Sequence, residues 1–260
     1  MEVWILYFAI YSFVGWLCET VYCSVGSGHF VNRGFLNGTF CPIYGFGALF
    51  ILFALQPYTD NILLVFFGGM LSTSILEYIT SWVMEKVFHN KWWDYSNKKC
   101  NIHGRVCLLN SVLFGILSVF MVFGLHPLVV RLVSVIPGWL QWTAAAVLGV
   151  YFAVDFIITV KTVLKLNERF ERLQQLKLEL VERLQAREMD YTLRELLDSV
   201  KDSKDELSTS IREKIRRLRE DNYAAQRRLL KAFPNLQTHK YAEHLADIRE
   251  AIKNRKKGRD

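Results

Sequence analysis

Apolar and polar residues alternate in long blocks along the first part of the chain. Five blocks of mainly apolar residues are separated by polar loops, and this pattern ends near residue 163. A helix needs about 20 mainly apolar residues to cross the hydrocarbon core of a bilayer. We therefore predict an all-α fold, a polytopic membrane helical bundle with about five spans. The predicted spans are residues 3–25, 40–57, 61–84, 105–125 and 139–161.

Two apolar segments depart from this simple pattern. The second block, residues 40–57, is short and contains Pro42 and two glycines, so we expect a kinked or tilted helix. Residues 127–137 are also apolar, but the segment is too short to span and contains Arg131. An interfacial or re-entrant segment fits residues 127–137 better than a sixth span.

Beyond residue 163 the composition changes. Residues 1–163 hold eight Lys and Arg and seven Asp and Glu, whereas residues 164–260 hold 24 and 18. This change predicts a transmembrane domain, residues 1–163, and a helical tail, residues 164–260, whose first helix continues directly from the last span. Apolar residues recur every three or four positions in the tail, which is typical of an amphipathic helix or a coiled coil. They include Phe170, Leu173, Leu176, Leu180 and Leu184.

The basic residues indicate the orientation, because Lys and Arg in short loops favour the cytoplasmic side of the membrane. The loop 85–104 carries four lysines, the loop 26–39 carries Arg33, and the tail begins with further basic residues. The other side carries Arg131. Five spans with the N-terminus outside place both loops and the tail in the cytoplasm, with the lipid bilayer around the apolar helices.

Two segments in the first part of the chain are similar to each other in sequence. Residues 73–115 repeat the order of residues 12–47, an apolar helix with one acid, a polar loop and a second apolar run. The distance from glycine to cysteine is three residues in both copies. We predict an internal repeat, with chance similarity of apolar helices as the alternative. The corresponding pairs are Glu19 and Glu77, His29 and His89, Gly38 and Gly104, Cys41 and Cys107, and Gly47 and Gly115.

The acids within the predicted spans are the main candidates for a functional site. An ionisable residue at the centre of a membrane helix costs roughly 2.5–3.5 kcal/mol on insertion scales, and such residues usually serve function. We predict a substrate- or ion-binding site around Glu19 and Glu77. The alternative is that each acid pairs with Arg, Asn or Trp to lock helix packing, which we favour for Asp155. Loop residues that complete the predicted site are Asn32, Arg33, Asp94 and Arg105.

Metal binding and hydrolytic chemistry have weaker support. Cys100, His103 and Cys107, together with Cys41, have residue types that bind zinc, but structural zinc sites usually show two clear pairs. We therefore assign no metal and no cofactor. The sequence lacks the G-x-x-x-x-G-K-[ST], H-E-x-x-H and G-x-S-x-G patterns, so we expect no P-loop ATPase and no enzyme of these hydrolase classes. Acids interleave with bases in the tail, and we expect no nucleic-acid partner.

Several strings of the chain resemble a known family of bacterial membrane proteins, labelled ABC-transporter type IV. The strings are GWLCE, NRGFLNGTFCPIYGFG, EYITSWVMEKVF, KWWDYS and GRVCLLNSVLFG, and the resemblance covers roughly residues 5–160. It implies a permease-like subunit in the plasma membrane, energised by a separate ATPase subunit, and the small number of spans makes a homodimer the natural completion. The positions that match the family pattern are Glu19, Asn32, Arg33, Gly34, Cys41, Pro42, Gly45, Glu77, Trp92, Trp93, Asp94, Gly104 and Arg105.

Two further functions stay open alongside a transporter subunit. A membrane anchor or scaffold would recruit a cytoplasmic partner through the helical tail. An intramembrane enzyme acting on a lipid or isoprenoid is less favoured, because no acid-rich D-D-x-x-D pattern occurs.

Overall fold

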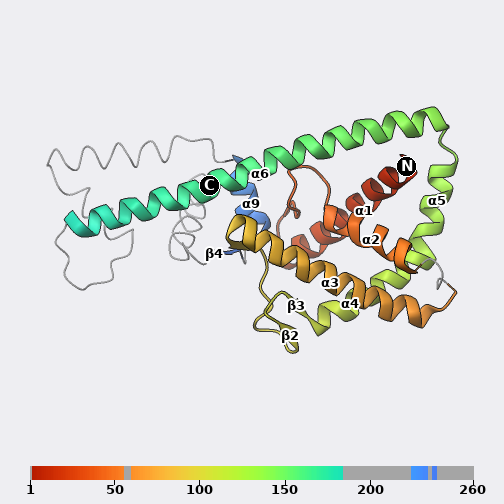
Figure 1. The fold of residues 1–260 in the computed structure, drawn as a ribbon, viewed down its shortest axis with the longest axis horizontal. Helices are drawn as coiled ribbons and strands as arrows, with labels where there is room; N and C mark the ends of the chain where they lie inside the picture. Colours follow the sequence, from red (N-terminus) through yellow and green to blue (C-terminus); the bar gives the residue numbers. More distant parts are fainter. Residues whose placement is uncertain (1, 56–59, 184–223, 234–235, 239–260) are drawn as a thin grey trace.

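The computed structural model describes residues 2–55, 60–183, 224–233 and 236–238. It shows a bundle of helices from one end of which a single long helix projects (Figure 1). α1 packs against α2 and α3 packs against α4, so the bundle contains two helical hairpins, and α2 joins them by packing against α3. The helices of the bundle are α1 Glu2–Ser27, α2 Pro42–Leu55, α3 Ile62–Phe88, α4 Leu108–Phe120 and α6 Gly138–Arg183.

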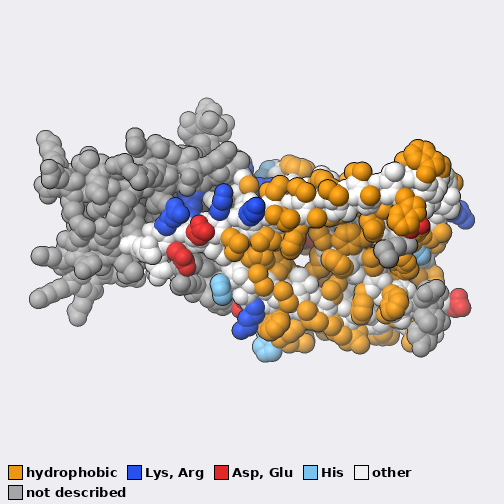
Figure 2. Space-filling view, turned by 45° about the horizontal axis from the view of Figure 1, so that its top comes forward, with side chains coloured by type: hydrophobic (Ala, Val, Ile, Leu, Met, Phe, Trp, Pro, Cys, Tyr) orange, Lys and Arg blue, Asp and Glu red, His pale blue; other side chains and the backbone are white. Residues whose placement is uncertain are grey.

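Among the residues that the structure describes, four helical segments are long and apolar enough to cross a membrane. They are Glu2–Ser27, Ile62–Phe88, Leu108–Ser134 and Gly138–Arg172. Hydrophobic side chains cover most of the face of the bundle that Figure 2 shows, and charged side chains lie at its two ends, several of them where α6 leaves the bundle. The chain is therefore a membrane protein.

The fifth predicted span, residues 40–57, forms only the short helix α2. This helix has 14 residues, or about 21 Å at 1.5 Å per residue, and a bilayer core is about 30 Å thick. A fifth span therefore stays a prediction, as does the internal repeat. Both hairpins nevertheless share one feature, because Cys41 directly precedes α2 and Cys107 directly precedes α4.

The helix that starts at Leu108 runs on beyond the predicted span 105–125. It continues through a π-helical turn, η2 Met121–Leu125, into α5 His126–Ser134, while the bounds of that span and the interfacial or re-entrant place of residues 127–137 stay predictions. The wider π turn and the proline at the start of α5 allow the axis to change direction. Figure 1 shows α5 turning across the end of the bundle towards the start of α6.

The predicted continuation of the last span into the tail is confirmed, since α6 is one helix of 46 residues. Its length, about 69 Å at 1.5 Å per residue, exceeds the thickness of a membrane core. Most of the predicted coiled-coil stripe lies outside the side chains that the structure describes. Phe170 is described, and it is fully buried.

The tail segment α9 Ala224–Ala232 returns to the end of the bundle that carries the two loops. After α9, β4 Gln237–Thr238 pairs with β1 Asn90–Lys91, and a second small sheet joins β2 Asn101–Ile102 to β3 Val106–Cys107. These short strands are the part of the fold that an all-α prediction misses.

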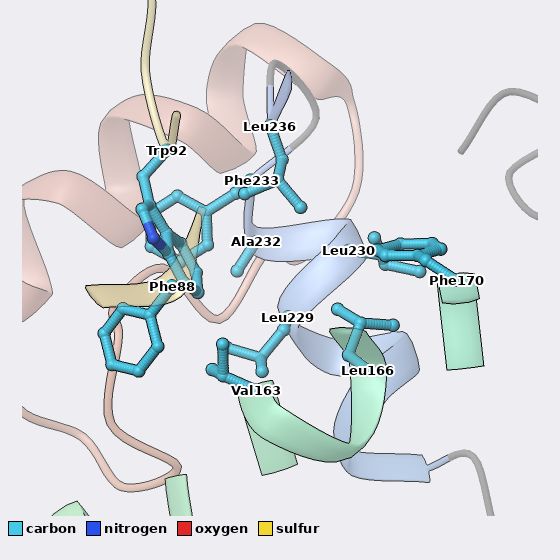
Figure 3. Close-up of a cluster of buried hydrophobic side chains, with 10 residues drawn as sticks. All are labelled: Phe88, Trp92, Val163, Leu166, Phe170, Leu229, Leu230, Ala232, Phe233 and Leu236. Carbon is cyan, nitrogen blue, oxygen red and sulfur yellow. The ribbon is translucent and has the colours of Figure 1, made fainter. Parts of the chain in front are cut away.

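A cluster of buried apolar side chains holds α9 against α6 and the end of α3. In Figure 3 the side chains of α9 face those of α6 and of the loop that follows α3. Phe233 lies with its ring centroid 4.8 Å from that of Trp92. Trp92 is therefore buried in this cluster. The cluster contains Phe88, Trp92, Val163, Leu166, Phe170, Leu229, Leu230, Ala232, Phe233 and Leu236.

Candidate functional site

The two hairpin loops and α9 meet at one end of the bundle. The loop that follows α1 places Phe35 with its ring centroid 5.2 Å from that of Trp92, in the loop that follows α3. Glu19 lies eight residues before the end of α1, and Glu77 lies eleven residues before the end of α3, near the middle of that helix. The charges of both predicted acids act on the hydroxyl of Tyr95, which the second loop supplies.

Glu19 is neutralised by its neighbours. The Nε of Arg33 donates to one carboxylate oxygen of Glu19 at 3.1 Å, and the hydroxyl of Tyr44 donates to the other at 2.6 Å. Both side chains of the ion pair are mostly buried, with 26% of Glu19 and 18% of Arg33 exposed. Charge pairing and hydrogen bonding together lower the cost of placing this acid in an apolar helix.

Arg33 also connects the acid to the tail. Its guanidinium lies over the ring of Phe233, 4.7 Å from the ring centroid, and donates to the carbonyl of Ala232. Arg228 of α9 donates in return to the carbonyls of the two residues that follow Arg33, at 3.2 and 3.0 Å. The first loop and α9 are therefore joined by polar contacts in both directions.

Glu77 has a different environment. Its side chain is only 6% exposed, and the hydroxyl of Tyr95 donates to Oε1 at 3.2 Å. The second carboxylate oxygen, Oε2, is buried and has no hydrogen-bond partner within the described part of the chain. Burial and the nearby charges of Glu77 and Glu19 raise the pKa of Tyr95, so its hydroxyl stays a proton donor.

Arg105 does not neutralise Glu77. Its Nη2 lies 2.6 Å from a carboxylate oxygen of Glu85, and its Nη1 donates to the hydroxyl of Tyr78 at 3.3 Å. The hydrogen bond to Glu85 raises the pKa of Arg105, which keeps the guanidinium charged. Arg105 thus belongs to a separate ion pair at the end of α3.

Asp94 organises the second loop. Its carboxylate accepts from Nζ of Lys91 at 2.6 Å and from the hydroxyl and backbone N–H of Ser96, at 2.6 and 3.2 Å. Burial raises the pKa of Asp94, but the hydrogen bonds from Lys91 and Ser96 outweigh this effect and lower it to about 2. Asp94 is therefore ionised at neutral pH and serves the loop.

Asn32 lies beside the first acid without touching it in the contacts described. Its Oδ1 accepts from the indole N–H of Trp16 at 2.7 Å, which fixes the start of the loop against α1. Of the six predicted site residues, Glu19 and Arg33 form an ion pair, and the charges of Glu19 and Glu77 both act on Tyr95. Asn32, Asp94 and Arg105 hold the surrounding loops.

Asp155 clamps the first loop to α6. Asn37 donates twice to the carboxylate of Asp155, from its backbone N–H at 3.0 Å and from its side-chain amide at 3.1 Å. The backbone N–H of Gly38 donates to the same carboxylate at 2.8 Å. This acid is thus satisfied by hydrogen bonds to the loop, which is the packing role favoured from the sequence.

Two functional side chains escaped sequence reasoning, Tyr44 and Tyr95. Each donates a hydrogen bond to one of the two acids. Aromatic residues are common in membrane proteins and at their interfaces, so neither tyrosine stood out. A tyrosine on the helix or loop that faces a buried acid is the signal that could have found them.

No group of three or more His, Cys, Asp or Glu residues suited to a metal ion occurs among the residues that the structure describes. Cys41 is buried, and its Sγ lies 3.6 Å from the carbonyl oxygen of Arg33. The site therefore offers carboxylates, tyrosine hydroxyls and one guanidinium.

Comparison with known proteins agrees with the motifs of the sequence. Residues 6–160 match the sequence model of a family described as "Putative ABC-transporter type IV". The match covers more than half of the chain and all six predicted site residues, while α9 lies beyond it. No curated protein and no solved structure matches the chain.

Proposed function

Because the chain belongs to the ABC-transporter type IV family, we propose that it is the membrane-spanning permease subunit of a transporter. In this proposal the chain is not itself an enzyme, and a separate ATPase subunit supplies the energy, since the sequence has no P-loop. The subunit works as a homodimer in the bacterial plasma membrane, with its N-terminus outside and its tail in the cytoplasm.

The observation that carries the proposal is the convergence of Glu19 and Glu77 from two separate hairpins. Acids inside membrane segments usually face the bundle interior and mark the path of an ion or substrate. Transporters often build such sites where two structural halves meet. Glu19, Glu77 and Arg33 form the proposed binding centre, and Asn32, Asp94 and Arg105 hold the loops around it.

The first test is affinity purification of the tagged full-length chain from its native membranes, followed by mass spectrometry. We expect an ATPase subunit in stoichiometric amount and ATP hydrolysis by the purified complex. Glu77→Gln should keep the subunit but lower ATP hydrolysis, because the proposed site is altered. Glu168→Gln is the matched control, since Glu168 is 63% exposed on α6 and should leave hydrolysis unchanged. Recovery of no ATPase would contradict the proposal.

The proposed orientation has its own test, because Cys100 is exposed in the loop that follows α3. A membrane-impermeant maleimide should label Cys100 in inside-out vesicles and leave it unlabelled in intact cells. Cys100→Ser identifies the label by its loss. Labelling in intact cells would place this loop outside and reverse the orientation.

A membrane scaffold is the second candidate, and the length of α6 favours it. The candidate span ends at Arg172, whereas the helix continues to Arg183. In that case the same purification should recover a cytoplasmic protein other than an ATPase, and a chain truncated after residue 183 should lose it. The packing of α9 against the site loops favours the permease, because it links the tail to the binding centre.

A further inference from the structure

The buried centre between the hairpins carries more negative than positive charge. Glu19 and Glu77 contribute two carboxylates, and Arg33 contributes one cation that is paired with Glu19. No Lys or Arg in the described ranges forms an ion pair with Glu77, whose hydrogen-bond donor is Tyr95. One negative charge at this centre is therefore not balanced by an ion pair among the residues that the structure describes.

The negative charge without a paired cation lies on Glu77, whose second carboxylate oxygen has no described hydrogen-bond partner. Glu77 is more than nine-tenths buried, and its Oε2 has no partner among the residues that the structure describes. A buried, ionised carboxylate without a partner costs several kcal/mol or more, and such a group usually takes up a proton instead. The geometry thus leaves Oε2 open to a further species, and a proton on this oxygen would remove the cost of the buried charge.

A proton fits the site better than a metal ion. Calcium takes 6–8 oxygen ligands, and magnesium requires an octahedral set. The described residues contain no group of three or more His, Cys, Asp or Glu suited to a metal. A proton needs one oxygen, and Oε2 of Glu77 provides it.

We propose that Glu77 is an exchangeable proton site, occupied in the state that the structure shows and emptied during the working cycle. This inference deepens the proposed function, because it names what binds at that site. The proton is held as the carboxylic acid of Glu77, with Tyr95 donating to the other oxygen. Loss of the proton leaves a carboxylate beside Glu19.

The groups around Glu77 are consistent with a proton that can leave and return. Glu19 of α1 is already held by Arg33 and Tyr44, so it does not share the proton of Glu77. Tyr95 keeps its own proton because its pKa is raised. The remaining titratable group near Tyr95 is the buried thiol of Cys107. Among these groups Glu77 is the acid with a carboxylate oxygen that has no partner in the described part of the chain.

Carbodiimide labelling tests the proposal on the purified full-length chain in detergent, with no ATPase and no substrate. Dicyclohexylcarbodiimide adds to a protonated, buried carboxyl group and forms an acylurea that mass spectrometry of peptides locates. We expect label on Glu77 at pH 6 and about a tenfold fall per pH unit once its proton is lost. Glu85, on the same helix but paired with Arg105, should stay unlabelled and is the internal control.

Three outcomes would overturn the proposal. Absence of label on Glu77 between pH 5 and 8 would show a permanently charged carboxylate, and pH-independent label would show a proton that does not exchange. Protection by sodium, potassium or ammonium chloride would identify a bound cation. Glu77→Gln should lose the label, but the wild-type pH profile decides even if that variant does not fold. Since the experiment needs no ATPase, failure of the permease assignment is seen separately in the purification above.

Discussion

The two hairpins contain the same types of residue in the same order, but they differ in how the acid of the first helix is paired. Each has an acid in the second half of its first helix, a polar loop with an arginine, and a second helix directly after a buried cysteine. In the first hairpin the loop arginine, Arg33, neutralises Glu19. In the second, Arg105 pairs with Glu85, and no ion pair of Glu77 occurs among the described residues.

Loop length explains the difference. The second loop is longer, and its extra residues form a turn in which Asp94 binds Lys91 and Ser96. The turn carries Arg105 to Glu85, eight residues after Glu77 and about two helical turns nearer the end of α3. The longer loop thus accompanies an arginine that pairs away from Glu77, while the relation of the hairpins by duplication stays a prediction.

Removal of Arg33 should have the largest effect. Arg33→Ala leaves Glu19 unpaired and removes the contacts with Ala232 and Phe233 of the α9 segment. Loss of one partner from a buried ion pair costs about 3–5 kcal/mol, and the residual exposure of this pair favours the lower value. Thermal unfolding in detergent measures the loss.

Arg105→Ala is the matched variant for the second hairpin, and hydrogen exchange distinguishes it from Arg33→Ala. It also breaks an ion pair, but its contacts lie on α3 rather than α9. Hydrogen exchange in α9 should therefore rise in Arg33→Ala and stay unchanged in Arg105→Ala. Equal exchange in both variants would show that the two arginines do not differ in this way.

Replacing each acid by glutamine should give the next largest difference in the free energy of unfolding between the two hairpins. Glu19→Gln leaves Arg33 without its charge partner and should lower the free energy of unfolding by about 1.5–3 kcal/mol, the range for hydrogen bonds to charged groups. Glu77→Gln replaces a protonated acid with a neutral group of similar shape, so the change should stay within about 0.5 kcal/mol. Chemical unfolding of both variants tests the comparison, and greater destabilisation by Glu77→Gln would reverse it.

The acids of the site could be predicted from sequence because each is conspicuous in an apolar helix. Glu19 and Glu77 are identified this way, and Arg33 is identified as a base in the first loop, which the structure pairs with Glu19. The role of α9 could not be predicted, since Arg33 and Ala232 are separated by 199 positions and nothing in the local pattern links them. The pairing of Arg105 was equally hidden, because it depends on the path of a loop rather than on helix periodicity.

A smaller loss of stability is expected when Gly104, in the turn that lengthens the second loop, is replaced. Gly104 has φ +66, and an added Cβ would lie 2.4 Å from Oδ1 of Asp94 and 2.5 Å from Oγ of Ser96. Left-handed backbone costs other residues about 1–2 kcal/mol, so Gly104→Ala should destabilise by at least that amount. Gly26→Ala is the control, because its Cβ would meet nothing within 4 Å. Equal thermal stability of both variants would contradict the tight turn.

The smallest loss of stability should come from replacing Asp94, the acid of that turn. The pKa of Asp94 is lowered to about 2, below its usual value near 4, so its stabilisation is full above pH 4 and disappears as the pH falls to 2. Asp94→Asn should cost about 0.5–1 kcal/mol at pH 7, and wild type and variant should converge near pH 2. Thermal unfolding against pH measures this convergence, with Asp60→Asn, at an exposed position, as the control. A constant difference from pH 7 to 2 would mean that the charge of Asp94 does not hold the turn.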